Sequence, residues 1–217
     1  MNEHHLKVSR TARYFSLGNP GTARHVWIAC HGYSQLARQF LGYLATLASA
    51  ERLIVAPEAL SRFYLAEGRG AVGASWMTKE DREHEIADYV GYLDTLHAEL
   101  AGQVPADTRF HLLGFSQGVA TAARWLEQGA RELDGVCFWA GTIPTEVDPN
   151  WALSRLSRRR VALSVGQKDE FVTPDWLERE QARFSVEGAE CRRFPFHGGH
   201  RMDRVVLAQV AGFLESD

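Results

Sequence analysis

The sequence has few cysteines, and this scarcity excludes a fold held together by disulfides. Three cysteines occur among 217 residues, an odd number, and none stands in the Cys-x-x-Cys spacing that is typical of zinc sites. Two of them lie within apolar strand patterns, so we expect reduced, buried side chains that behave as small hydrophobic residues. No metal site is expected.

Long apolar runs are also missing. No segment approaches the ~18 consecutive apolar residues that a membrane-spanning helix needs. Residues 1–17 are too polar for the apolar core of a signal peptide. We therefore expect no membrane span and a cytoplasmic location.

The chain carries no strong excess of charge of either sign. Its formal net charge is −3 at pH 7, whereas nucleic-acid-binding domains usually present a clustered basic surface. The tight basic run Arg158-Arg159-Arg160 precedes a strand pattern and is most simply a solvated loop. No nucleic-acid partner is expected.

What the chain does contain is a regular alternation of strand and helix patterns. With 217 residues, of which 45% are hydrophobic, it is long enough for one core, so we expect a single domain over residues 1–217. The alternation predicts an α/β fold with a mainly parallel sheet covered by helices on both faces. Strands are expected over residues 8–17, 25–30, 53–56, 110–114, 135–140, 161–165 and 191–196. Helices are expected over residues 37–50, 80–101, 117–128, 176–186 and 201–215.

One apolar strand pattern ends in Gly114-Phe115-Ser116-Gln117-Gly118 and passes directly into a helix pattern. This predicts a serine nucleophile on a sharp strand-to-helix turn, where the residues two before and two after the serine must be small. The backbone amide of Gln117 would then point toward the oxygen of an attacked carbonyl group. A glycine-rich turn that merely opens a helix would look similar, so the interpretation depends on finding catalytic partners.

A serine nucleophile needs a histidine base and a carboxylate that orients this base. Asp169 follows the strand pattern at residues 161–165, at the edge where parallel strands collect catalytic groups. We take it as the candidate acid, with Glu170 and Asp175 as alternatives. Asp175 is better explained as the N-cap of a helix that begins at Trp176, and Asp169 itself could simply cap a turn.

The candidate base is His200, which ends the turn His197-Gly198-Gly199-His200. The two glycines allow the backbone to turn sharply enough to aim the imidazole at Ser116, and His197 is the alternative. The resulting chain order of serine, aspartate and histidine is the one found in α/β-hydrolases.

The loop after residues 25–30 begins with His31-Gly32-Tyr33. A glycine here lets the backbone approach a substrate, so the amide of Tyr33 would be a second oxyanion donor beside that of Gln117. We expect His31 to brace the loop by hydrogen bonding. The alternative is an ordinary turn between a strand and a helix.

Together these motifs resemble the carboxylesterase/phospholipase family of α/β-hydrolases, which includes bacterial carboxylesterases and acyl-protein thioesterases. The resemblance extends over about residues 22–215, and the Phe-Ser-Gln within the serine turn is its most distinctive part. It implies a sheet of about seven strands and a serine esterase or thioesterase without a cofactor, with Ser116, Asp169 and His200 as catalytic triad and Tyr33 and Gln117 as oxyanion donors. The family usually has glycine and then an acidic or small residue soon after the His-Gly pair. This chain has Tyr33-Ser34-Gln35, so the resemblance leaves the shape of the acyl entrance open.

Two connections are long for a compact domain. Residues 57–78 mix aromatic residues with glycines, which fits a mobile flap over an apolar acyl pocket, or alternatively a packed excursion over the sheet edge. Residues 141–159 are expected to line the leaving-group side. The residues that we expect to contact substrate are Phe63, Tyr64, Leu65, Trp76, Met77 and Phe171.

The sequence therefore predicts a serine hydrolase that cleaves small-molecule esters or thioesters through an acyl-enzyme. Alternatives are a serine hydrolase that cleaves peptides or lactones, a non-catalytic binding protein with the same fold, and an interaction protein that uses the aromatic flap to dock a partner. Apolar residues on the flap could also serve a homodimer contact.

Overall fold

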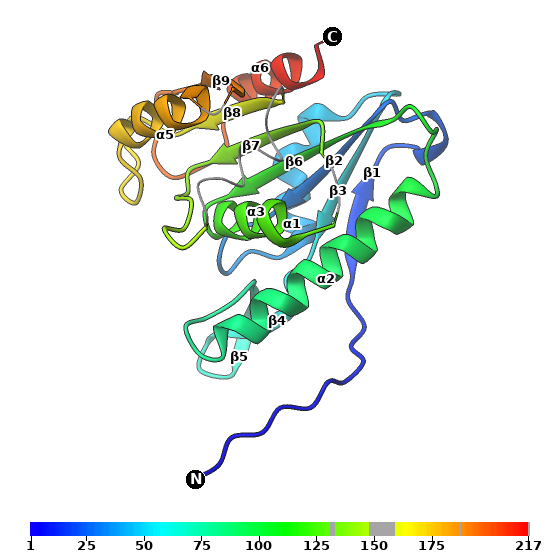
Figure 1. Ribbon diagram of the computed structural model, residues 1–217, viewed down its shortest axis with the longest axis vertical. Coiled ribbons are helices and arrows are strands. Elements are labelled where there is room, and N and C mark those ends of the chain that lie inside the picture. The colour runs from blue at the N-terminus through cyan, green and yellow to red at the C-terminus, as the bar shows by residue number, and fades with distance from the viewer. Residues whose placement is uncertain (131–132, 148–158, 187, 217) are drawn as a thin grey trace.

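The computed structural model describes residues 1–130, 133–147, 159–186 and 188–216. Its centre is a seven-stranded sheet in the order β1-β3-β2-β6-β7-β8-β9 (Figure 1). The first pair, β1 and β3, is antiparallel, and every other neighbouring pair is parallel. The strands are β1 (Tyr14–Leu17), β2 (His25–Cys30), β3 (Arg52–Pro57), β6 (Arg109–Phe115), β7 (Gly135–Trp139), β8 (Arg160–Ser164) and β9 (Glu190–Arg193).

Helices cover both faces of this sheet, as the alternating pattern predicts. They are α1 (Ala37–Leu44), α2 (Arg82–Ala101), α3 (Gln117–Gln128), α5 (Pro174–Val186) and α6 (Arg204–Glu215). Buried residues of α2, α3 and α5 form one core cluster, and those of α1 and α6 form the other. Alternate residues of β2 enter opposite clusters, Val26 and Ile28 on one side and Trp27 on the other, because side chains alternate across a strand.

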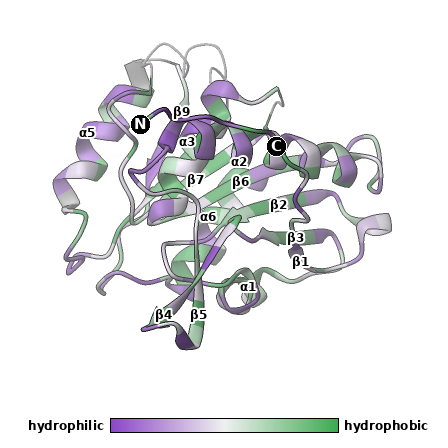
Figure 2. Cartoon of the chain, turned by 90° about the horizontal axis from the view of Figure 1, so that it is seen from below, coloured by the Kyte–Doolittle hydropathy of each residue, from purple (hydrophilic) through white to green (hydrophobic). Residues whose placement is uncertain are grey.

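Burial on both faces explains why the central strands are almost continuously apolar. Strands β2, β6 and β7 are coloured as hydrophobic in Figure 2, while the helices also carry hydrophilic residues. Every residue of β7 is buried, as are all residues of β2 except His25. The expected fold class, an α/β-hydrolase-like sheet of about seven mostly parallel strands, is confirmed.

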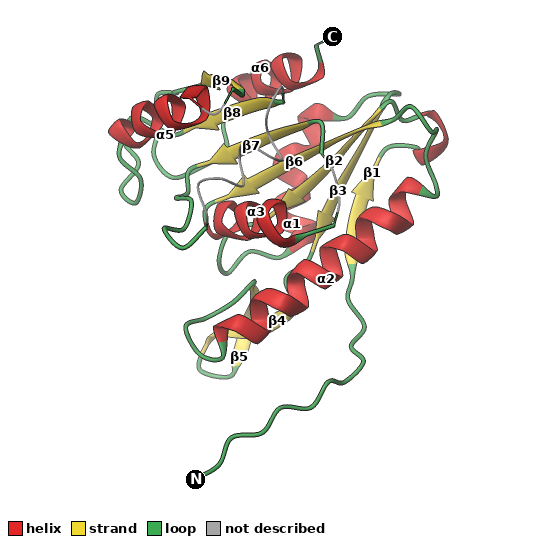
Figure 3. Ribbon diagram, in the orientation of Figure 1, coloured by secondary structure: helices red, strands yellow, loops and turns green. Residues whose placement is uncertain are grey.

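Some predicted element boundaries are wrong. The first strand begins at Tyr14 and not at residue 8, because its partner β3 ends at Pro57, which faces Tyr14 in the pairing. The residues before it form an exposed loop segment (Figure 3). The helix expected over residues 37–50 ends at Leu44 and continues as a short 3₁₀ turn, Ala45–Leu47, which leads back toward β3.

The connection over residues 57–78 is largely regular structure. It forms an antiparallel hairpin of β4 (Ser61–Ala66) and β5 (Arg69–Ser75), separate from the main sheet. The hairpin packs closely on the loop after β2, since a Cβ on Gly73 would lie 2.5 Å from the carbonyl oxygen of Ser34. Of the second long connection, residues 148–158 lie outside the described part of the chain, so the expectation for residues 141–159 stays a prediction.

Glu58 lies just after β3, and its buried carboxylate connects three segments of the chain. Its side chain is 1% exposed and accepts hydrogen bonds from Arg13 at 2.6 Å and Arg62 at 3.1 Å. It also accepts a bond from the amide of Ala37, the first residue of α1. Burial alone would raise the pKa of Glu58, but these hydrogen bonds hold it below its ordinary value of 4.5.

We expect Glu58→Gln to lower the free energy of unfolding at pH 7 by about 1–2 kcal/mol, a modest loss because both arginines are partly solvated. A carboxylate with a lowered pKa stabilises the folded state above pH 4.5, and this contribution disappears as the pH falls through its folded-state pKa. Urea unfolding at pH 7 and at more acidic pH measures the difference between the two proteins. A difference that stayed constant at acidic pH would contradict this role.

Among the described residues, no helix combines the length and the hydrophobicity that crossing a bilayer requires.

Candidate active site

Ser116 occupies the sharp turn between β6 and α3, as the sequence predicts. Its backbone has φ 55° and ψ −118°, a conformation that non-glycine residues rarely adopt. The turn also needs both glycines, because a Cβ on Gly114 would lie 2.4 Å from the carbonyl oxygen of Gly118. A Cβ on Gly118 would lie 2.1 Å from the carbonyl oxygen of Cys30. Strand, turn and helix can therefore come this close only with glycine at both positions.

The fold brings Ser116, His200 and Asp169 into one line of hydrogen bonds. His200 Nε2 lies 2.9 Å from Ser116 Oγ, and His200 Nδ1 lies 2.9 Å from Asp169 Oδ2. A carboxylate oxygen only accepts, so Nδ1 carries the proton and Nε2 is free to accept the serine hydroxyl. This is the arrangement in which a histidine can act as a base toward serine.

The carboxylate of Asp169 is held firmly in place. Its side chain has 0% exposure, and Oδ1 accepts the backbone amides of Phe171 at 2.9 Å and Val172 at 3.0 Å. The other oxygen, Oδ2, remains for His200. The loop after β8 thus fixes the carboxylate, and the carboxylate fixes the imidazole.

The residues considered as alternatives to Asp169 and His200 do not take part in this line of hydrogen bonds. Glu170 and His197 are exposed. Asp169 is the residue that accepts the hydrogen bond from His200 Nδ1. Asp175 is also exposed, and it lies within the first turn of α5. The helix begins at Pro174, so the expectation that Asp175 is the N-cap is wrong. Proline suits the first helical position because its missing N–H would be unpaired there anyway.

Two backbone amides stand where oxyanion donors are expected. Gln117 follows the serine at the start of α3, and Tyr33 lies in the loop after β2. Within the described residues, neither amide donates to a protein acceptor, whereas the neighbouring amide of Ser34 donates to Ala74 at 2.9 Å. A Cβ on Gly32 would lie 3.1 Å from the Cβ of Ser116, so this loop directly adjoins the serine.

His31 braces that loop, as expected. Its Nδ1 donates to the carbonyl of Gly32 at 2.8 Å, and its Nε2 accepts the amide of Ala59 at 3.1 Å. The side chain is fully buried, and burial lowers its pKa, which keeps the ring neutral at pH 7. Because both ring nitrogens are occupied, His31 serves as a support for the backbone around Gly32.

The side chain of Gln117 binds the segment that follows β5. Its Nε2 donates to the carbonyl of Met77 at 2.9 Å, and its Oε1 accepts the amide of Trp76 at 3.2 Å. Trp76 is 2% exposed and donates its indole N–H to the carbonyl of His31 at 2.8 Å. The indole thus connects the hairpin to the His31 loop, and the expected contact between Trp76 and substrate remains a prediction.

Three other residues expected to bind substrate lie on β4, and a fourth lies beside His200. Phe63 stacks on Tyr33 with ring centroids 5.3 Å apart, while Tyr64 and Leu65 are half exposed on β4. Phe171 is 74% exposed and packs edge-on against His200 at 4.8 Å. Their contact with substrate remains a prediction.

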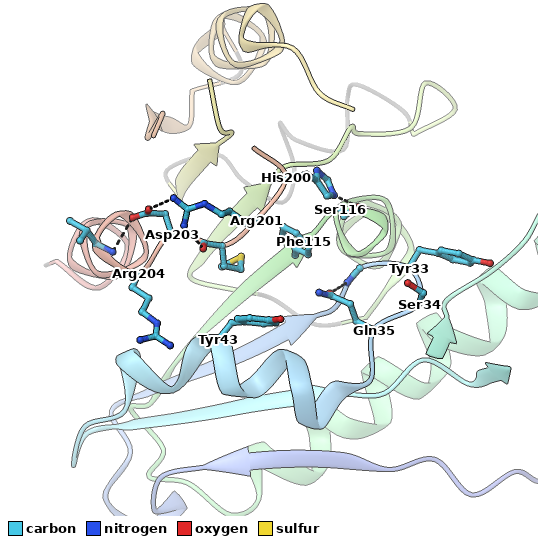
Figure 4. A pocket seen from close by; sticks show the side chains of 13 residues that line it. Tyr33, Ser34, Gln35, Tyr43, Phe115, Ser116, His200, Arg201, Asp203 and Arg204 are labelled. Carbon is cyan, nitrogen blue, oxygen red and sulfur yellow. Dashed lines mark hydrogen bonds and ion pairs between the residues drawn. The ribbon is translucent and has the colours of Figure 1, made fainter. Parts of the chain in front are cut away.

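A pocket of about 690 Å³ opens beside Ser116 and His200 (Figure 4). Residues of the loop after β2, of α1 and of the segment from His200 into α6 line it, and no residue of the hairpin connection 57–78 does. The flap expected over residues 57–78 therefore stays a prediction. The lining residues are Gly32, Tyr33, Ser34, Gln35, Tyr43, Phe115, Ser116, His200, Arg201, Met202, Asp203, Arg204 and Val205.

Most residues that line this pocket were not predicted from the sequence. The run from Arg201 to Val205 directly follows the candidate base, so its place in the chain was a usable signal. Tyr43 gave no such signal, because only the packing of α1 beside the serine turn brings it to the pocket.

One group of potential metal ligands assembles at the surface. His5 and His84 both approach Asp81 Oδ1, at 3.3 Å and 2.6 Å, and the three residues are exposed. The two imidazole rings also stack at 4.0 Å. Hydrogen bonding to one carboxylate accounts for this grouping, and we assign no metal to it.

Comparison with known proteins places this geometry in context. No family model and no curated protein matches the sequence. Solved structures do match along nearly the whole chain. The esterase PE8 is 24% identical with a TM-score of 0.68, and the match covers 94% of this chain and 98% of PE8. The acyl-protein thioesterase 2 of Zea mays is 20% identical with a TM-score of 0.70, with coverage of 94% and 98%. The carboxylesterase of Bacillus cereus is 13% identical with a TM-score of 0.69, with coverage of 94% and 93%. At these identities the likeness establishes the fold, and the chain thus has the α/β-hydrolase fold.

Proposed function

We propose that the protein is a serine hydrolase that cleaves carboxylic ester or thioester bonds of small acyl substrates through an acyl-enzyme. The observation that carries this proposal is the continuous line of hydrogen bonds from Asp169 through His200 to Ser116, with the serine on a strained turn. These three residues come from distant parts of the chain. A purely structural role gives no reason for a buried carboxylate, a histidine and a strained serine to align in this order.

In the proposed reaction, Ser116 Oγ attacks the carbonyl carbon while His200 Nε2 takes the hydroxyl proton. Asp169 stabilises the imidazolium that forms and keeps Nδ1 protonated. The tetrahedral intermediate collapses, the C–O or C–S bond to the leaving group breaks, and His200 returns the proton to the leaving alcohol or thiol. Water then attacks the acyl-enzyme by the same route and releases the acid.

The amides of Tyr33 and Gln117 are the proposed donors to the oxyanion. Hydrogen bonds within the protein hold both positions: Gln35 Oε1 accepts the amide of Gly32 at 2.8 Å, and the Gln117 side chain binds the segment after β5. Donors that need no rearrangement during the reaction stabilise the developing charge most effectively. A single donor of this kind contributes about 3–4 kcal/mol to transition-state stabilisation.

The names of the structural neighbours are consistent with this chemistry. They include an esterase, an acyl-protein thioesterase and a carboxylesterase. We further propose that residues 1–217 act as one domain, since both core clusters draw on the same sheet.

A fluorophosphonate probe gives the direct test, because it reacts only with an activated serine. We expect stoichiometric labelling at Ser116, identified by peptide mass spectrometry, together with hydrolysis of p-nitrophenyl acetate that the probe abolishes. A protein that is folded but neither labelled nor active would instead be a binding protein with this fold, and the proposal would be wrong.

A further inference from the structure

The pocket beside Ser116 is lined by both apolar and charged side chains. Phe115, Tyr43, Met202 and Val205 supply apolar surface, and Tyr43 and Val205 are 49% and 70% exposed. Arg201, Asp203 and Arg204 are the charged residues of the lining besides His200. Figure 4 shows Arg204 at the end away from Ser116, with Tyr43 between them. A substrate that extends from Ser116 along this pocket would pass the ring of Tyr43 and then meet the positive charge of Arg204.

The charges of Arg201 and Asp203 already have partners. Arg201 lies 3.2 Å from Asp203 Oδ2, and its guanidinium also packs over the ring of Phe196 at 5.6 Å. Asp203 caps α6, where Oδ1 accepts the amides of Val205 and Val206 at 3.1 Å and 3.2 Å. The negative charge of Asp203 is thus satisfied by Arg201 and by the start of the helix.

Arg204 is different. It lies in the first turn of α6, is exposed, and makes no ion pair with any described residue. Arg52, by contrast, pairs with Glu215 at 2.6 Å. The pocket therefore ends at a cation whose hydrogen-bond donors are not taken up by an ion pair within the described part of the chain. A guanidinium of this kind suits a planar anion, above all a carboxylate, which it can bind with two parallel hydrogen bonds.

We propose that Arg204 selects substrates that carry a carboxylate several bonds from the scissile carbonyl, so that the preferred substrates are anionic esters or thioesters. This inference rests on the proposed function. A pocket of about 690 Å³ has room for such a molecule, because binding sites for small molecules typically measure ~300–1,000 Å³. The carboxylate could belong to the acyl group, as in a half-ester of a dicarboxylic acid, or to the leaving group.

Two pairs of synthetic esters distinguish these sources. For the acyl side, the mono-p-nitrophenyl esters of glutaric and adipic acid are compared with the same compounds bearing a methyl ester in place of the free carboxylate. For the leaving-group side, 4-acetoxybenzoate is compared with its methyl ester. The two members of each pair are similar in size but differ in intrinsic reactivity, so the change in the ratio of kcat/KM between the wild type and a variant at Arg204 reports the effect of the negative charge.

We expect the wild type to prefer the anionic member of at least one pair, and Arg204→Gln to lower kcat/KM for that anionic ester by about tenfold while the neutral ester is unaffected. Arg204→Lys should keep part of the preference, Arg204→Glu should reverse it, and added salt should weaken it. Arg38→Gln is the matched control, since Arg38 is exposed on α1 but does not line the pocket. Thermal unfolding confirms that each variant is folded.

Hydrolysis of the neutral esters without preference for the anionic ones in either pair, or a preference that survives in Arg204→Gln, would overturn this inference and leave the proposed function intact. Absence of turnover for all esters by the folded wild type would overturn both.

Discussion

Ser116→Ala is expected to lower kcat on p-nitrophenyl butyrate by about 10⁶-fold, the loss typical of removing a triad nucleophile. The reason is that the alanine variant offers no atom to attack the carbonyl, although His200 and the oxyanion amides stay in place. Alanine has the same Cβ as serine and meets no further strain at φ 55°. The fold should therefore persist, which circular dichroism and thermal unfolding can show.

Ser49→Ala is a suitable control for this experiment, because Ser49 is exposed in a turn before β3 and lies outside the pocket lining. Its activity should match that of the wild type. If Ser116→Ala kept most of its activity while folded, Ser116 would not be the nucleophile and the proposed mechanism would fall.

Asp169→Asn is expected to lower kcat by about 10⁴-fold with little change in stability. The asparagine carbonyl oxygen can still accept the amides of Phe171 and Val172, so the loop after β8 should hold its shape. The amide NH₂ would then face His200 Nδ1 and could only donate to it. This favours the tautomer with the proton on Nε2, and such a ring cannot accept the proton of Ser116.

The matched control is Glu170→Gln, which removes one carboxylate charge from the next residue in the chain. Glu170 is exposed, and the hydrogen bond from His200 goes to Asp169 instead. Measurement of kcat over a range of pH for both variants shows which of the two carboxylates orients His200. A large loss in Glu170→Gln together with near-normal activity in Asp169→Asn would assign the acid to Glu170.

These expectations concern the chemical step, whereas the pocket concerns the choice of substrate. Ser116 and His200 themselves line the pocket, but Arg204 lies at the end away from Ser116 (Figure 4). The triad residues come from loops at the carboxyl ends of β6 and β8 and from the loop after β9, which the parallel sheet brings to one edge. The charged end of the pocket comes from the start of α6. A change at Arg204 should therefore alter selectivity without altering the triad.

Much of the site was readable along the chain because its chemistry depends on short motifs. The serine turn needs Gly114 and Gly118 for a steric reason that acts over five residues, and α3 begins at Gln117 as the pattern indicates. Strand β2 likewise has the expected bounds, since an apolar run buried on both faces is a strong local signal. The order of serine, aspartate and histidine then suggested the three partners.

Other features had no local signal. The sequence could not tell that residues 61–75 pair as a hairpin, because β-pairing depends on register and on the Ser34 loop against which Gly73 packs. Nor could it tell that Trp76 is buried beside His31, since a tryptophan that follows a glycine-rich segment fits a binding surface equally well.

Local order along the chain therefore indicated the strands of the main sheet, the serine turn and the candidate triad residues, because each depends on neighbouring residues or on the shared edge of a parallel sheet. The shape and charge of the pocket were settled only when α1 and the start of α6 came together beside Ser116. Contacts between segments more than 150 residues apart, such as α1 with Tyr43 and α6 with Arg204, follow from helix packing, which no sequence motif encodes.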